Sequence, residues 1–495
     1  MADRKPLIHA GNRVQIAILV ISALLVVLNV LRILHVPLTF DECAPYAEIT
    51  RPYWNILCFD AVSANNHILN TLCRKFFVEA FADTPFWLRF DSLLAQLMFL
   101  WYSYRLSSRL FTDRTWQIPV FILLNLHPFM FEFWGLSRGY GLSIAFMTGS
   151  VYWLVRYVQD KRMLFLNAGL YFAILAAYSN FTLMDYYCGI ICFLVLRSVL
   201  PAAEKRNYRV MLSELLSIVI ASAVLYVAVA GPIRRLIEDN QLYYGGNNGF
   251  VADTLVSVIK ENMFLGGPSV APLLNILATT TVVITIATGM CWGIKLIKKR
   301  PGTGEMTGIL LWVLVAAPGI GFVAQHLLLG TLYPINRSGL FFIPLFMLSL
   351  IYWLSDITRT KRLIGNIIIY LLTAAILYNF VSNMNISSTR MWWFGCNDLV
   401  VLNRIAQESK DNPRKSKVCA FWIFIPSFNY YIETASYGRY IETALEFKDG
   451  KPKNDSSFDY YYIPAEVRSL IPQCYVVDTG FYGNSFLLLR RVGNK

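Results

Sequence analysis

The stretch Leu38–Asn70, LTFDECAPYAEITRPYWNILCFDAVSANNHILN, comes directly after the first long apolar run and determines how the rest of the chain is interpreted. It holds the carboxylates Asp41, Glu42, Glu48 and Asp60, while most of the chain beyond it is apolar. A carboxylate pair at the end of a membrane helix is costly when half-buried. The pair is therefore either fully solvated or retained for chemistry. In the second case this stretch contains the functional site of the protein.

The composition around this stretch predicts a polytopic α-helical membrane protein. Of the 495 residues, 56% are hydrophobic and only 15% are charged, and the mean hydropathy is +0.48. About eleven apolar runs have the ~17 to 25 residues needed to cross the hydrocarbon core. They lie near 14–37, 88–110, 116–134, 140–157, 164–181, 183–200, 211–232, 271–294, 307–329, 338–355 and 363–382.

Basic residues predict the orientation of these spans, because Lys and Arg in short loops favour the cytoplasmic side. Every second loop is basic, which places the N-terminus in the cytoplasm and the C-terminal tail outside. The first run is too long for a signal peptide and lacks a cleavage site, so it is expected to remain as a helix. The basic residues include Arg13, Arg105, Arg109, Arg114, Arg156, Lys161, Arg162, Lys295, Arg359, Lys361 and Arg362.

The predicted division is a transmembrane domain over 1–382 and an extracytoplasmic domain over 383–495. The first outer loop, 38–87, has apolar residues at helical spacing and is expected to form two short amphipathic surface helices. A second outer loop, 233–270, contains the flexible run GGNNG and could close over a substrate. In the C-terminal part, VCAFWIFIP, QCYVVDTG and NSFLLLRRV are typical of β-strands, which predicts a small α/β domain.

The net charge and the cysteines limit the classes of ligand and partner that the protein is expected to bind. The net charge of +13 fits the topological bias and contact with anionic lipid headgroups, and no basic run carries the stacking aromatics of a nucleic-acid-binding face. No CxxC or HExxH spacing points to zinc, so no metal site is predicted. Six of the nine cysteines fall in outer segments, where pairing in an oxidising compartment is possible in any connectivity.

The ionisable residues in and beside the spans gather at their outer ends. A secondary transporter carries its polar groups near the bilayer midplane, so this distribution favours work at the outer interface on a lipid-linked anionic substrate. Taken singly, an arginine there is also explained as a snorkelling anchor and a histidine as a satisfied interfacial residue. The set comprises Asp41, Glu42, Arg89, Asp91, Glu132, Arg138, Asp185, His326 and Arg337.

Four short motifs in this order resemble a known family. They are FDECAPYAEI at the outer end of the first helix, NNHILNTL in the loop, LSRGYGLSI at the start of the fourth helix and YPINRSGLFFIPLF at a late helix. Together they resemble the GT-C glycosyltransferases, in particular the aminoarabinose and protein-mannosyl transferase type. The resemblance implies a GT-C-like membrane fold and a polyprenyl-phosphate sugar as donor.

Chemistry and resemblance together predict the site. Asp41 is expected to be the general base that deprotonates the acceptor, with Glu42 as second choice. Polyprenyl phosphate is a good leaving group when cations hold it, so one carboxylate is sufficient, and attack opposite the phosphate inverts the anomeric centre. The donor phosphate is assigned to Arg138, Arg337 and Tyr140, and the remaining substrate contacts to Glu48, Asn66, His67 and His326. No cofactor is predicted, although a divalent cation at the acidic pair stays open.

The leading prediction is thus an integral-membrane glycosyltransferase of a bacterial inner membrane. It would transfer a sugar from polyprenyl phosphate to a glycan, lipid or protein acceptor at the outer face. The alternatives are a flippase or transporter of a lipid-linked sugar and a non-catalytic membrane scaffold. The scaffold leaves the acids and arginines at the outer face unexplained.

Overall fold

The computed structural model describes residues 6–60, 63–199, 208–265, 267–298, 301–447 and 457–492. By its internal contacts the chain forms two compact units. The first comprises Met1–Val30, Tyr53–Cys73 and Arg89–Met384, and the second comprises Leu31–Pro52, Arg74–Leu88 and Asn385–Lys495. Residues 38–87, predicted as the first outer loop and called by that name below, are therefore divided between the two units.

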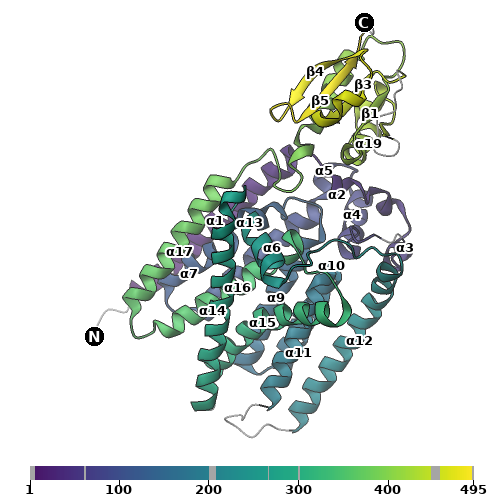
Figure 1. The fold of residues 1–495 in the computed structure, drawn as a ribbon. Coiled ribbons are helices and arrows are strands. Elements are labelled where there is room, and N and C mark those ends of the chain that lie inside the picture. The colour runs from purple at the N-terminus through teal and green to yellow at the C-terminus, as the bar shows by residue number, and fades with distance from the viewer. Residues whose placement is uncertain are drawn as a thin grey trace. The chain divides into compact units, whose positions relative to one another are not determined.

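The named elements in the described part of the first unit are all helices (Figure 1). Its longer elements in chain order are α1 (Pro6–His35, up to Val30), α6 (Phe90–Leu110), α7 (Arg114–Asn125), α9 (Gly139–Asp160), α10 (Met163–Ser179), α11 (Met184–Val199), α12 (Tyr208–Glu238), α14 (Ala271–Lys298), α15 (Thr303–Leu329), α16 (Phe342–Ile357) and α17 (Arg362–Asn383). Its shorter elements are α3 (Tyr53–Leu57), the start of α4 (Ile68–Ala80), α8 (Pro128–Glu132), η2 (Phe181–Leu183), η3 (Phe250–Leu255), α13 (Val256–Asn262), η4 (Pro268–Val270) and η5 (Asn336–Gly339).

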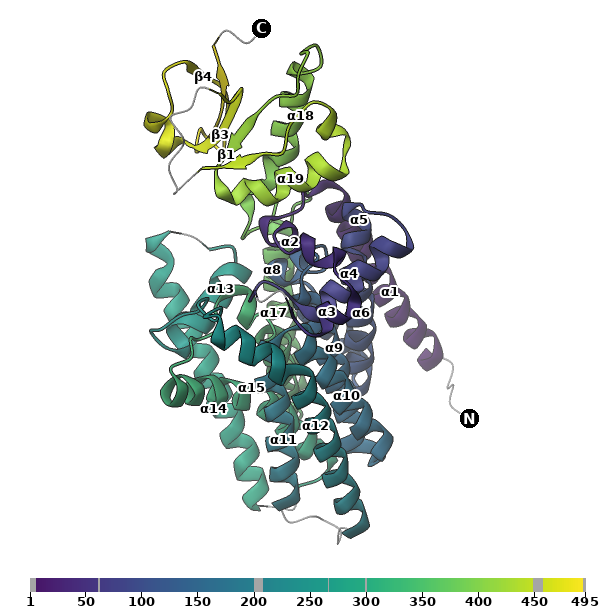
Figure 2. The ribbon, with the colours of Figure 1, turned by 90° about the vertical axis from the view of Figure 1, so that its right-hand side faces the viewer.

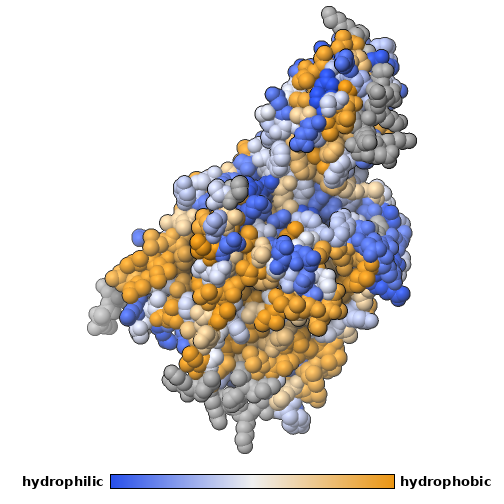
Figure 3. Space-filling view, viewed as in Figure 1, coloured by the Kyte–Doolittle hydropathy of each residue, from blue (hydrophilic) through white to orange (hydrophobic). Residues whose placement is uncertain are grey.

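Seven helical segments in the described ranges are long and apolar enough to cross a membrane, which supports an integral membrane protein. Hydrophobic residues cover much of the exposed surface of these helices (Figure 3). The count of eleven spans stays a prediction, because α6 and α9 have the length but are more polar and α10 is shorter. The seven are Arg13–His35, Phe181–Ser198, Tyr208–Glu238, Ala271–Leu296, Thr303–Leu329, Asn336–Ile357 and Arg362–Asn383.

The run expected as one span over 116–134 is not one helix. It divides into α7, of 12 residues, and α8, of five. His127 is extended, and Pro128 at the first position of α8 provides no backbone N–H and disfavours helical geometry in the residue before it. At 1.5 Å per residue α7 is about 18 Å long, short of a ~30 Å hydrocarbon core.

Close packing of α9 against α10 forms the centre of the first unit, and the two helices run side by side (Figure 2). They are joined at Lys161, which adopts the left-handed conformation (φ 54°) that ends α9. Ser150 Oγ donates to the carbonyl of Gly169 at 2.7 Å, and a Cβ on Gly169 would lie 2.9 Å from the side chain of Leu154. Small residues and a hydroxyl bond thus bring the backbones together, as is common between membrane helices.

The second unit contains a five-stranded sheet in the order β2-β1-β3-β5-β4. Strand β1 is parallel to β2 and β3, whereas β5 is antiparallel to β3 and β4. The strands are β1 (Val418–Ala420), β2 (Leu445–Glu446), β3 (Tyr460–Pro464), β4 (Tyr475–Phe481) and β5 (Phe486–Arg491). The other elements are α2 (Phe40–Cys43), η1 (Tyr46–Thr50), the rest of α1 and α4, α5 (Pro85–Leu88), η6 (Trp393–Asn397), α18 (Asp398–Glu408), η7 (Trp422–Phe424), α19 (Ile425–Thr434), η8 (Ser436–Arg439) and η10 (Ala465–Leu470).

Successive side chains of β3 point to opposite faces of the sheet, and both faces are covered by hydrophobic cores. Tyr460 and Tyr462 face a core that includes α18, α19 and the α2 segment, while Tyr461 and Ile463 face a second core on the other side. A strand buried on both faces has an uninterrupted aromatic run in place of alternation, so YYYIP was not predicted as a strand from the sequence. Conversely, VCAFWIFIP is a strand only over 418–420 and then turns into η7 and α19.

Candidate functional site

The start of α9 sets the position of the first predicted arginine. Arg138 is the N-cap residue of α9, with extended backbone (φ −138°, ψ 144°), and its side chain is 1% exposed. The first N–H groups of a helix have no partner within it and carry a partial positive charge. Arg138 therefore adds a full positive charge where the backbone is already electropositive.

The guanidinium of Arg138 donates to three acceptors from the first outer loop. Nη1 donates to the backbone carbonyl of Asn65 at 2.9 Å, and Nη2 donates to the side-chain oxygen of the same residue. Nη2 also lies 3.4 Å from Nε2 of His67. These contacts orient the guanidinium toward the His67 side of the loop.

The hydrogen bonds of His67 define its tautomer. Its Nδ1 lies 3.1 Å from the carbonyl oxygen of Ser179, which can only accept, so Nδ1 carries the proton. Nε2 is then the unprotonated nitrogen and accepts from Arg138. Burial, and next the positive charge of Arg138, hold the pKa of His67 well below its usual value, and Arg337 acts in the same direction. His67 is thus a neutral acceptor beside two arginines.

Gly139 makes this arrangement possible. A Cβ at this position would lie 2.2 Å from the carbonyl oxygen of Ser179 and 2.7 Å from Cγ of His67. Both distances are far below van der Waals contact, so a side chain here would displace the very groups that orient His67. The glycine in the SRGYG motif therefore has a packing reason.

Tyr140 connects the two arginines. Its hydroxyl accepts from Nε of Arg337 at 3.2 Å, and its ring lies 4.8 Å from the His67 ring and 5.9 Å from the guanidinium carbon of Arg138. Arg337 lies in η5, distant in sequence from α9. The structure thus brings together Arg138, Tyr140, Arg337 and His67, four residues that the sequence singled out.

Tyr244 from the second outer loop completes this group. Its hydroxyl accepts from Nη1 of Arg337 at 3.1 Å, and its ring centroid is 4.4 Å from the guanidinium carbon. We refer to Asn65, His67, Arg138, Tyr140, Tyr244 and Arg337 as the cationic cluster. Neither Asn65 nor Tyr244 was assigned to the site from the sequence. Asn65 stands directly before the Asn66-His67 pair, and Tyr244 directly before the Gly-Gly run.

The loop that carries Tyr244 is fixed to the turn that precedes Arg337. Gly246 and Tyr333 exchange two backbone hydrogen bonds of 2.9 Å. A Cβ on Gly245 would lie 2.4 Å from Leu332, and one on Gly246 would lie 2.2 Å from the carboxyl carbon of Asp253. The two glycines of GGNNG, interpreted as a flexible run, are therefore needed for close approach.

The predicted acidic pair lies in α2 of the second unit, where Asp41 is 7% exposed and Glu42 is fully buried. Glu42 closes a capping box, because its Oε2 accepts from the backbone N–H of Thr39 at 2.9 Å and from the Thr39 hydroxyl at 3.0 Å. Arg74 also donates to the carbonyl of Glu42 at 2.9 Å. Glu42 thus has a structural task that favours Asp41 as the reactive carboxylate.

The other predicted contact residues make contacts of their own. In the second unit Glu48 pairs with Arg51 at 3.1 Å; burial raises its pKa, and Arg51 offsets part of this rise. In the first unit Asn66 is buried and accepts from Thr71 at 2.7 Å. Nδ1 of His326 lies 2.7 Å from the carbonyl of Thr331, and its ring packs on Tyr333 with centroids 4.4 Å apart.

Metal and disulfide chemistry were both open in the sequence. In the part of the chain that the structure describes, no three His, Cys, Asp or Glu side chains gather as a metal site. No disulfide joins any of the nine cysteines, all of which lie in the described ranges. The expectation that the protein has no metal site, with a divalent cation at Asp41 and Glu42 left open, stays a prediction.

No protein-family model and no curated protein matches the sequence. Among solved structures, the chain is similar to ArnT from Cupriavidus metallidurans in the apo state, with 11% identity and a TM-score of 0.48. It is also similar to ArnT from the same organism bound to undecaprenyl phosphate, with 10% identity and a TM-score of 0.46. Each match covers 97% of this chain and 98% of the other. Likeness at this level does not assign a family.

Proposed function

We propose that this protein is an integral-membrane glycosyltransferase that transfers a sugar from a polyprenyl-phosphate carrier to an acceptor at the outer face of the membrane. The setting would be a bacterial inner membrane, with the N-terminus cytoplasmic and residues 383–495 outside. The observation that carries the proposal is the cationic cluster. It gathers Arg138 and Arg337 around Tyr140 and keeps the intervening histidine neutral.

The chemistry of the cluster suits a phosphate attached to a lipid. A guanidinium makes two parallel hydrogen bonds to phosphate oxygens, which a lysine ammonium cannot reproduce. Two arginines stabilise the negative charge that develops on a departing phosphate. The partial positive charge at the N-terminus of α9 acts in the same direction. The tyrosine rings provide the amphipathic surface that is favoured at the level of the lipid headgroups.

The remaining requirement is a base for the acceptor. A hydroxyl or amine must lose its proton as it attacks the anomeric carbon, and a single carboxylate does this. We assign this role to Asp41, because Glu42 is held in the capping box with Thr39. The electron pair of the bond to the carrier phosphate leaves with the phosphate, which stays charged and needs no acid. Attack from the opposite face inverts the anomeric centre.

The second candidate is a flippase or transporter of a lipid-linked sugar. The same cluster would bind the carrier phosphate, so binding alone does not separate the two functions. They differ in chemistry, because a flippase leaves the bond between sugar and phosphate intact.

The test is a transfer assay in detergent, where no sealed compartment exists. Purified protein is incubated with a polyprenyl-phosphate donor that carries a labelled sugar, with and without a membrane-extracted pool of glycan, lipid and protein acceptors. Transfer of label and release of polyprenyl phosphate are expected, with loss of both in Asp41→Asn. Tight donor binding with an intact donor after long incubation would favour the flippase instead.

A further inference from the structure

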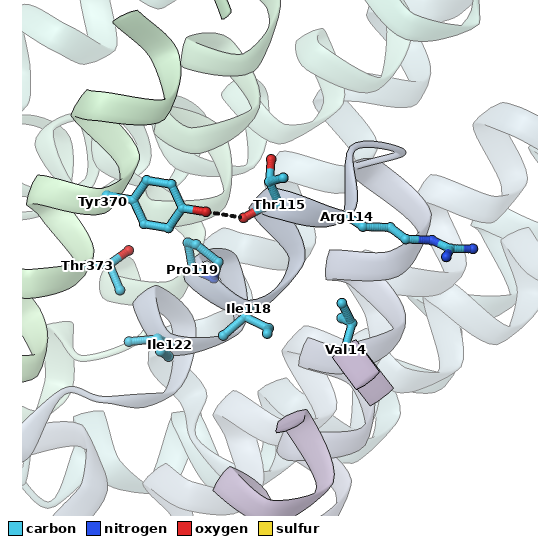
Figure 4. Close-up of a pocket in the computed structure, with 8 residues that line it drawn as sticks. All are labelled: Val14, Arg114, Thr115, Ile118, Pro119, Ile122, Tyr370 and Thr373. Carbon is cyan, nitrogen blue, oxygen red and sulfur yellow. Dashed lines mark hydrogen bonds between the residues drawn. The ribbon is translucent and has the colours of Figure 1, made fainter. Parts of the chain in front are cut away.

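A groove in the first unit is lined by residues that do not belong to the cationic cluster. Its volume is about 380 Å³, within the ~300 to 1,000 Å³ typical of ligand sites. Its walls come from three helices, and they are almost entirely apolar (Figure 4). The lining includes Val14 of α1, Ile118, Pro119 and Ile122 of α7, and Tyr370 and Thr373 of α17.

Two hydrogen bonds hold α7 against α17 at one end of this groove. Trp116 Nε1 donates to the side-chain oxygen of Asn366 at 2.8 Å, and the Tyr370 hydroxyl donates to the carbonyl of Thr115 at 3.3 Å. Both bonds involve the first turn of α7. The walls that come from α7 and α17 are therefore held together by side-chain hydrogen bonds.

The same end of the groove carries positive charge. Arg114, which lines the groove, is exposed, and its guanidinium extends away from the aliphatic lining in Figure 4. Arg362 begins α17 one turn before Asn366, and Arg13 precedes Val14; both are exposed. The nearby carboxylate of Asp113 accepts from the backbone N–H of Thr115 at 3.0 Å and caps α7.

We propose that this groove binds an anionic diacyl phospholipid, with an acyl chain along the aliphatic wall and the phosphate at Arg114. Apolar lining that ends at the exposed guanidinium of Arg114 matches a molecule with an apolar tail and an anionic head. Basic pockets between membrane helices on the cytoplasmic side are a known setting for such headgroups. The predicted orientation places Arg114 on that side, so this lipid would belong to the inner leaflet.

The test measures lipid binding to the delipidated full chain by native mass spectrometry, with phosphatidylglycerol and phosphatidylcholine of equal chain length. Wild-type protein is expected to bind the anionic lipid more tightly. Arg114→Gln should lower the affinity for phosphatidylglycerol about tenfold, because one charge-assisted contact is lost. Its affinity for phosphatidylcholine should be nearly unchanged. Ile118→Trp fills the groove and should lower the affinity for both lipids.

The matched control is Arg209→Gln, at an exposed arginine in the first turn of α12 that does not line the groove. It should bind both lipids as wild type does. Equal losses in Arg114→Gln and Arg209→Gln would overturn the proposal, as would unchanged binding in Ile118→Trp variants that unfold at the wild-type temperature. Loss of polyprenyl phosphate instead of phosphatidylglycerol in Arg114→Gln would also overturn it and assign the groove to the carrier tail.

Discussion

Nη2 of Arg138 lies 3.4 Å from Nε2 of His67, and the other nitrogen of that ring faces the carbonyl of Ser179. One histidine thus accepts from an arginine and donates to the backbone, which is possible only when the ring is neutral. A protonated ring would place a second positive charge against Arg138. The protonation state of His67 is therefore linked to the geometry of the proposed phosphate site.

The pH dependence of stability should reflect this link. Burial and Arg138 lower the folded-state pKa of His67 below that of the unfolded chain, so the unfolded state binds more protons as pH falls. The stability of the protein should therefore drop as pH falls through about 6.5. Thermal unfolding from pH 7.5 to 5 is expected to show a shallower decline in His67→Gln. The exposed His35→Gln is the control, and an equal effect in both would contradict the assignment.

Donor binding should depend on the guanidinium forks of Arg138 and Arg337. Replacing either by Lys keeps the charge but loses the two-point contact, so the affinity for polyprenyl phosphate should fall about tenfold or more. The measurement is equilibrium binding of the carrier, with Arg234→Lys as control because this arginine is exposed and pairs only locally with Glu238. Wild-type affinity in both cluster variants would reduce these residues to interfacial anchors.

Asp41→Asn should abolish most turnover while leaving donor binding intact. The amide keeps the size and hydrogen bonding of the side chain but cannot take a proton, so a loss of about 100-fold or more is expected. Glu42→Gln keeps an oxygen that can accept from Thr39 and should retain most activity. Glu42→Ala removes the cap and should cost about 1 kcal/mol of stability. Loss of turnover in Glu42→Gln alone would move the role to Glu42.

Gly139→Ala should disturb the cluster from the backbone side. The new methyl group would lie 2.2 Å from the Ser179 carbonyl oxygen, so α9 or His67 must shift, at a cost of about 1 to 3 kcal/mol. Gly293→Ala is the matched control, since nothing lies within 4 Å of its Cβ and helical Ala is preferred by about 0.5 to 1 kcal/mol. Unfolding temperature and donor affinity should both fall in the first variant only.

Tyr244→Phe removes one acceptor of Arg337 and keeps the ring. The hydroxyl accepts from Arg337 at 3.1 Å and, more weakly, from Nδ2 of Asn336 at 3.4 Å, so its removal predicts a few-fold rise in the KM for the donor with little change in kcat. The neighbouring Tyr243, which is 73% exposed, provides the control substitution Tyr243→Phe. Identical kinetics in the two variants would show that the Tyr244 hydroxyl has no role in donor binding.

Several features could be predicted from the sequence because their signals are local. Long apolar runs predict spanning helices regardless of partners, and seven segments meet that description. The capping sequence before Asp41 is likewise readable, as Thr39 and Glu42 stand three residues apart. The break at Pro128 was not predicted, because the run over 116–134 was judged by its overall hydropathy and not by the effect of Pro128 on the residue before it.

The sequence alone indicated an integral membrane protein and singled out the arginines and carboxylates beside its helices, since hydropathy and charge act over short stretches of chain. Only the tertiary structure decided that Arg138 and Arg337 share Tyr140, that His67 is a neutral acceptor, and that Tyr244 joins them. Those relations depend on close approach between residues far apart in the chain, set by glycines such as Gly139 and Gly246. Distances of a few ångströms between distant segments arise from packing, which no local pattern encodes.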